Sequence, residues 1–95
     1  MKPLYFITSI STNINRDSRC IGYYETLAQA RKLIFKQYDM IGEAGYYQYV
    51  IIEEFGPGWY PYIGKPEEWY RIYKNSVKKI KKPKRYKRVG SFGIG

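Results

Sequence analysis

One segment of the chain, residues 46–55 with the sequence YYQYVIIEEF, restricts the possible folds more than any other. Successive side chains of a strand point to opposite faces of its sheet. Here positions 46, 50 and 52 are apolar on one alternating set, and positions 47, 49, 51 and 55 are apolar on the other. A strand that is apolar on both faces is typical of the interior of a sheet. The segment therefore predicts a central strand that is covered on both sides.

A single helix is predicted before this strand. The sequence TLAQ at positions 26–29 fits a capping box, in which the Thr26 hydroxyl accepts from the Gln29 amide and Gln29 reaches back. Apolar residues at positions 27, 30, 33, 34, 38 and 41 have the spacing of one helical face, and Gly42 supplies a C-terminal stop. These signals predict a helix over residues 27–41. The basic residues of this helix fall mostly on the opposite face, where we expect them to be solvated: Arg31, Lys32 and Lys36.

The remaining chain alternates between β-rich runs and loops. Strands are predicted over residues 3–10, 19–24, 67–74 and 77–82, and irregular loops over residues 12–18 and 56–61. The element order ββαβββ predicts an α+β fold, with one helix on a mostly antiparallel sheet. We expect an α+β domain over residues 1–77 and a basic C-terminal segment over residues 78–95, which provides a last strand plus a tail.

One helix can cover only one face of such a sheet. The other face must be exposed, covered by the C-terminal segment or buried in an oligomer. Large tyrosine-rich surfaces are seldom left bare in a monomer, and 12 of the 95 residues are Tyr. We therefore expect a homodimer or a higher oligomer formed through this face.

The positive charge is concentrated at the C-terminal end. Residues 1–70 carry seven basic and all eight acidic side chains, whereas residues 71–95 carry ten basic side chains and no acidic one. This asymmetry favours a phosphate-bearing or acidic partner. The alternative is a solvated tail that only aids solubility.

Several classes of function have no support in the composition. The chain lacks histidine, and its single cysteine, Cys20, can form neither an internal disulfide nor a zinc knuckle. No apolar run is longer than the four residues at 49–52, which is too short to span a bilayer. Within each of the pairs Glu53-Glu54 and Glu67-Glu68, the two neighbouring side chains point to opposite faces of their strand. Neither pair therefore makes a two-carboxylate site. We expect a cytoplasmic binding protein with no catalytic residues, metal, cofactor or membrane partner.

Aromatic and basic residues interleave in the second half of the chain. Trp69, Arg71 and Tyr73 share one face of their predicted strand, and stacking rings beside cations suit a nucleobase that carries phosphates. The candidate ligand-binding residues are Trp59, Tyr60, Tyr62, Trp69, Arg71, Tyr73 and Lys74. The candidate phosphate- or polyanion-binding residues are Lys78, Lys79, Lys81, Lys82, Lys84, Arg85, Lys87 and Arg88. The alternative is that Trp59 and Trp69 are core residues and that the tyrosines cover the sheet.

Five short motifs resemble a set of small phage, prophage and gut mobile-element proteins with the pattern GYF…YxYAVIE…GxYP…WY…GFxIG. They are GYY at 22–24, GYYQYVIIEE at 45–54, GWYP at 58–61, EWY at 68–70 and GSFGIG at 90–95. The run over residues 78–88 is more basic here than in that set. The resemblance implies a phage context, in which small proteins without catalytic residues often inhibit host defence. Some of them bind cyclic-nucleotide immune signals, and others bind a defence protein directly.

Three functions follow as hypotheses. The first is a non-enzymatic counter-defence protein that sequesters a nucleotide-derived signal in the host cytoplasm. The second is a nucleic-acid-binding accessory protein that uses the basic segment, whose binding would depend strongly on salt. The third is a direct protein inhibitor that docks its tyrosine-rich face on a defence effector.

Overall fold

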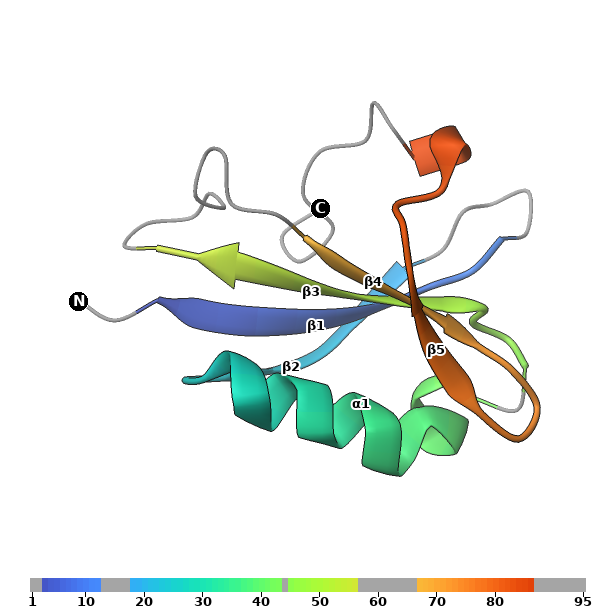
Figure 1. The fold of residues 1–95 in the computed structure, drawn as a ribbon, viewed down its shortest axis with the longest axis horizontal. Coiled ribbons are helices and arrows are strands. Elements are labelled where there is room, and N and C mark those ends of the chain that lie inside the picture. Colours follow the sequence, from blue (N-terminus) through green and yellow to red (C-terminus); the bar gives the residue numbers. More distant parts are fainter. Residues whose placement is uncertain (1–2, 13–17, 44, 57–66, 87–95) are drawn as a thin grey trace.

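The computed structural model describes residues 3–12, 18–43, 45–56 and 67–86. In this part of the chain the elements are β1 (Leu4–Ile10), β2 (Ser18–Tyr24), α1 (Leu27–Ile41), β3 (Tyr49–Phe55), β4 (Glu68–Ile72), β5 (Val77–Ile80) and the 3-10 helix η1 (Lys84–Tyr86). The five strands form one sheet in the order β2-β1-β3-β4-β5, in which all neighbours are antiparallel (Figure 1). The predicted α+β class and ββαβββ order are confirmed.

The central strand is β3, and both of its faces are buried as predicted. Val50 and Ile52 pack with residues of α1 in one apolar cluster. Ile51 belongs to a second cluster on the other face of the sheet. The strand begins at Tyr49, three residues later than predicted, because the preceding residues form a turn after α1.

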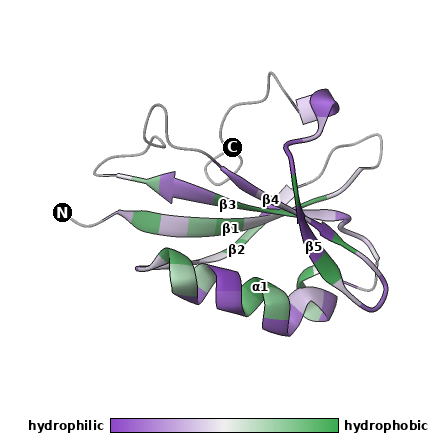
Figure 2. Cartoon of the chain, in the orientation of Figure 1, coloured by the Kyte–Doolittle hydropathy of each residue, from purple (hydrophilic) through white to green (hydrophobic). Residues whose placement is uncertain are grey.

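Helix α1 has the predicted boundaries. The Gln29 amide donates to the Thr26 hydroxyl over 3.2 Å, which is the N-terminal cap that the sequence indicated. Figure 2 shows hydrophobic and hydrophilic residues alternating along α1, and its buried residues Ala30, Ile34 and Ile41 face the sheet. No helix in the described part of the chain has the length and apolarity needed to cross a membrane.

The helix ends at Gly42 for a different reason from the one expected. Gly42 keeps right-handed backbone angles (φ −75°), and the positive φ of the turn, 47°, falls on Glu43. A Cβ atom on Gly42 would lie 3.1 Å from Ile72 Cγ2 and 3.3 Å from the carbonyl oxygen of Tyr38. The glycine therefore permits close packing of the helix end against β4 rather than a left-handed turn.

The C-terminal part of the described chain covers part of the second face of the sheet. Figure 1 shows α1 on one side of the sheet and η1 on the other. The Tyr86 ring, 3% exposed, stacks on Trp69 with ring centroids 5.2 Å apart, and both residues cluster with Ile10 and Ile51. Residues 78–86 are thus built into the fold through β5 and η1. Because η1 already covers this part of the face, the expected homodimer would have to use the rest of it, and it stays a prediction.

Trp69→Ala should lower the free energy of unfolding by about 3–5 kcal/mol, because it leaves a cavity beneath Tyr86. Tyr73→Ala is the control, since Tyr73 is 46% exposed and its loss should change stability by no more than about 1 kcal/mol. Chemical denaturation followed by circular dichroism measures both. Equal stability of the two variants would contradict the packing role of Trp69.

Candidate functional site

Five of the candidate residues lie outside the described part of the chain. They are Trp59, Tyr60, Tyr62, Lys87 and Arg88. The other candidates, Trp69, Arg71, Tyr73, Lys74 and six basic residues between positions 78 and 85, can be placed, and the structure divides them into buried, paired and free side chains.

Trp69 is a core residue. Its side chain is 1% exposed, and its ring lies against those of Tyr86 and Tyr49. No face of the indole is open to a ligand in this arrangement. Of the two alternatives left open by the sequence, the core position describes Trp69.

Arg71 lies on the same face of the sheet and is partly exposed. The guanidinium carbon lies 5.0 Å from the centroid of the Tyr49 ring and 5.8 Å from that of Tyr73. Both distances are within the range of cation–π contacts. Among the described residues Arg71 makes no ion pair, and its cross-strand neighbour on β5 is another cation, Lys78. Two aromatic rings therefore orient a positive charge that pairs with no carboxylate of the described residues.

The turn between β4 and β5 adds two more of the predicted residues. Tyr73 is half-exposed and its amide donates to the Ser76 carbonyl over 2.7 Å, while Lys74 is exposed at the turn. Tyr73 and Arg71 are in contact, and Lys78 is opposite Arg71 in the register. We call Arg71, Tyr73, Lys74 and Lys78 the Arg71 surface.

Beside this surface is a cleft of about 480 Å³, which we call the Tyr73 cleft. Its lining comes from the end of α1, the turn before β3 and the β4–β5 turn: Asp39, Gly42, Gly45, Tyr47, Gln48, Ile72, Tyr73 and Lys74. The volume is within the range of sites that bind small molecules. Tyr73 and Lys74 belong to both the Arg71 surface and the cleft, so the two adjoin at the β4–β5 turn.

Gln48 holds the walls of the Tyr73 cleft together. Its Oε1 accepts from the backbone nitrogen and the hydroxyl of Thr12, at 2.7 and 2.8 Å, and its Nε2 donates to the Gly45 carbonyl over 2.6 Å. Its own carbonyl accepts from the Ile72 amide over 2.8 Å. Sequence reasoning missed the cleft and this residue, because partners up to 36 positions away leave no local pattern.

The basic residues of β5 and the following segment fall into two groups. Lys79 and Lys82 form ion pairs with Glu68 and Glu67, at 3.6 and 2.9 Å. The others are exposed and make no ion pair within the described residues: Lys78, Lys81, Lys84 and Arg85. These four remain candidates for contact with an anionic partner, and Figure 2 shows η1 as strongly hydrophilic.

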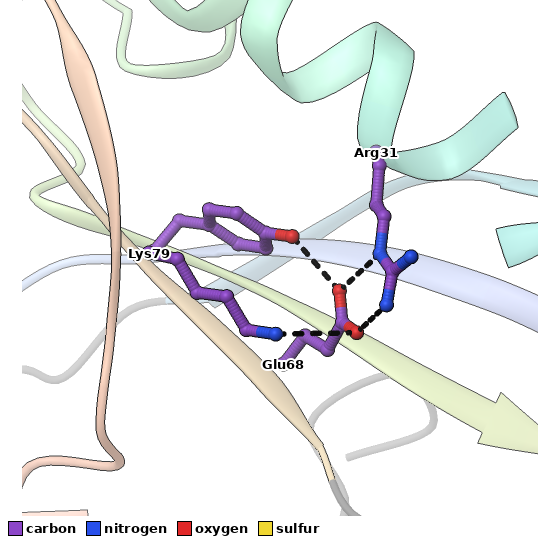
Figure 3. A network of polar contacts seen from close by, with 4 residues as sticks. Arg31, Glu68 and Lys79 are labelled. Carbon is purple, nitrogen blue, oxygen red and sulfur yellow. Dashed lines mark hydrogen bonds and ion pairs between the residues drawn. The ribbon is translucent and has the colours of Figure 1, made fainter. Parts of the chain in front are cut away.

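A carboxyl group with a strongly lowered pKa is in a different place, between α1 and β4 (Figure 3). Glu68 accepts two hydrogen bonds from the Arg31 guanidinium and one from the Tyr70 hydroxyl, at 2.8 Å, and Lys79 lies 3.6 Å away. Arg31 was expected to be solvated on the outer face of the helix. Arg31 is exposed as expected, but its guanidinium group also reaches across to a carboxylate 37 positions later in the chain, a contact that was not predicted.

These contacts set the protonation of the group. The hydrogen bonds from Arg31 are the main cause that lowers the pKa of Glu68 to about 2, against the opposing effect of burial. Burial first, and the bond to Glu68 second, raise the pKa of Tyr70. The Glu68 hydrogen bond raises the pKa of Arg31. Such a carboxylate is held ionised and is occupied by its partners, so it fastens α1 to the sheet and is a poor general acid or base.

Comparison with protein-family models, with curated protein sequences and with solved structures gives no match to this chain. The site is therefore interpreted from its own geometry.

The depressed pKa of Glu68 predicts a specific pH dependence of stability. A carboxyl group with a folded-state pKa of about 2 and an unfolded pKa near 4.3 stabilises the fold above about pH 4.3, and this contribution disappears as the pH falls towards 2. Glu68→Gln should therefore lower the free energy of unfolding by about 1 kcal/mol at pH 7, which corresponds to about 4–8 °C in melting temperature. Its melting temperature should meet that of the unmodified protein near pH 2.

The matched control is Glu43→Gln, which breaks the more exposed Arg19–Glu43 ion pair of 3.2 Å. The difference in melting temperature between Glu43→Gln and the unmodified protein should stay small from pH 7 to pH 2. Thermal melts of all three proteins across this range measure the effect. A difference in melting temperature between Glu68→Gln and the unmodified protein that is the same at every pH would refute the lowered pKa of Glu68.

Proposed function

We propose that this protein is a non-enzymatic binding protein that holds a nucleotide-derived ligand on the Arg71 surface. The observation that carries the proposal is the Arg71 guanidinium, which is oriented by the rings of Tyr49 and Tyr73 and has no carboxylate partner among the described residues. A planar guanidinium group binds phosphate through two parallel hydrogen bonds.

The neighbours of Arg71 support a phosphate-bearing ligand in particular. Lys78 lies opposite it on β5 and Lys74 lies in the adjoining turn, so three cations gather where no acidic residue occurs between positions 71 and 86. The half-exposed ring of Tyr73 is in contact with Arg71 and offers a stacking surface. An aromatic ring beside free cations is the arrangement that binds nucleobases with their phosphates.

The biological role in this proposal is phage counter-defence in the host cytoplasm, by sequestration of a cyclic-nucleotide immune signal. The resemblance to small phage and mobile-element proteins supports that context. Trp59, Tyr60 and Tyr62 remain proposed members of the site.

Nucleic-acid binding is the second candidate. The observation in its favour is that Lys81, Lys84 and Arg85 are exposed and free of ion pairs within the described chain, close in sequence and next to the Arg71 surface through β5. Free cations along one segment bind polyanions through counterion release, without sequence specificity.

Arg71→Gln should weaken binding of cyclic nucleotides about 10- to 100-fold, because it removes a charged hydrogen-bonding group worth roughly 1.5–3 kcal/mol. Lys32→Gln is the matched control, since it removes the same charge from an exposed position of α1 and should leave affinity unchanged. Isothermal titration with cyclic GMP, cyclic AMP and cyclic UMP measures this. The proposal fails if the unmodified protein binds none of them, or if the two variants bind equally.

Changing Lys81, Lys84 and Arg85 together to Gln tests the contribution of the C-terminal cations. Lys82 is excluded because it pairs with Glu67. We expect weaker binding of anionic ligands with little change in melting temperature, because exposed charges add little stability. For single-stranded DNA the log–log salt slope should fall by about 2. Unchanged affinity for both cyclic nucleotides and DNA at low salt would reject these residues as a binding element.

A further inference from the structure

The Tyr73 cleft has walls of opposite charge. Asp39, in the last turn of α1, lies on one wall, and Lys74, in the β4–β5 turn, lies on the other. Neither side chain makes an ion pair within the described residues, so the two charges are not within 4.0 Å of each other. The cleft therefore keeps an anionic and a cationic group apart, with space between them.

The interior of the cleft is suited to a flat ring. Ile72 and the buried ring of Tyr47 provide apolar surface, and the exposed ring of Tyr73 forms one side. At Gly45 (φ +94°) a Cβ atom would meet nothing within 4 Å, and at Gly42 the bare backbone lies against Ile72. Two glycines thus leave the cleft open where side chains would otherwise narrow it.

The side of the cleft formed by α1 offers hydrogen-bond acceptors, so it favours a ligand group that donates hydrogen bonds. One oxygen of Asp39 accepts from the Met40 amide over 2.9 Å, and the carboxylate keeps further acceptor positions. The last turn of α1 contains no basic residue, so the negative end of the helix dipole adds to the charge of Asp39. The amide of Gln48 is already committed to Thr12 and Gly45.

We infer that the Tyr73 cleft binds the base of the nucleotide ligand and that this base is guanine. This inference rests on the proposed function of the Arg71 surface. Guanine carries two adjacent N–H donors, at N1 and N2, which fit the two oxygens of one carboxylate. Adenine and cytosine place an acceptor beside their amino group, and uracil has one N–H between two carbonyl groups. The phosphate then lies towards Lys74 and Arg71.

The charges of the two walls explain why a nucleotide fits better than a simple anion. Inorganic phosphate would be attracted by Lys74 and repelled by Asp39 in the same cleft. A purine nucleotide has its donor edge at one end and its negative charge at the other, so it complements both walls at once.

The test compares cyclic GMP, cyclic AMP and inorganic pyrophosphate by isothermal titration. The unmodified protein should bind cyclic GMP about tenfold or more tightly than cyclic AMP, as expected for one bidentate base contact. Asp39→Asn keeps the size of the side chain but exchanges one acceptor for a donor. It should lower the affinity for cyclic GMP to the affinity for cyclic AMP. Binding of pyrophosphate should be unchanged or slightly stronger in this variant.

The matched control is Glu25→Gln, which removes an exposed carboxylate just before α1, at the opposite end of the helix. It should preserve the preference for cyclic GMP. Tyr73→Ala removes the stacking ring and one of the two rings that orient Arg71, so it should weaken the binding of both cyclic nucleotides. Amide chemical shifts of Gly42, Gly45 and Lys74 should move on addition of cyclic GMP.

The possible failures are distinguishable. One outcome is that both cyclic nucleotides bind, that Arg71→Gln weakens their binding, and that Asp39→Asn leaves the ratio of the two affinities unchanged. This outcome overturns the guanine assignment, and the proposed function stands. A preference for cyclic AMP in the unmodified protein also overturns the assignment. If no cyclic nucleotide binds to the unmodified protein, both the proposed function and the inference fail.

Discussion

The burial of β3 on both faces is the constraint on which the rest of the structure depends. A strand with apolar side chains on both sides needs two covers, and the described part of the chain supplies one α-helix. Helix α1 covers one face, and Tyr86 of η1 packs on the other through Trp69 and Ile51. The C-terminal segment is therefore a structural part of the domain as far as residue 86, although its composition suggests a solvated tail.

Features that depend on neighbouring residues could be predicted from the sequence. Helix α1 begins and ends where its cap and periodicity indicated, because each signal acts within about one turn. The start of β3 was predicted three residues too early, since YYQ looks like a strand but Gln48 is engaged with Thr12. The Arg31–Glu68 contact was missed for the same reason, because only the folded chain brings these residues together.

The candidate site was partly predicted. Interleaved aromatic and basic residues correctly indicated that Arg71 and Tyr73 lie together, since alternation places them on one face. Alternation could not distinguish Trp69 from Tyr73, which share that face. The packing of Tyr86 decides between them, because it buries the first ring and leaves the second half-exposed. The Tyr73 cleft has no sequence signature, since three separate segments form it.

The position of Tyr86 has a consequence for how the domain is made. Its hydroxyl reaches the carbonyl of Ser11 over 3.5 Å, a contact that spans 75 positions of the chain. During translation, α1 and the strands as far as β3 leave the ribosome well before this tyrosine does. Nascent chains accordingly carry Ile51 and then Trp69 with one side unprotected until η1 has left the ribosome. Such an intermediate exposes apolar surface and is vulnerable to association with other chains, so a pause in translation before residue 86 would extend the period of greatest risk.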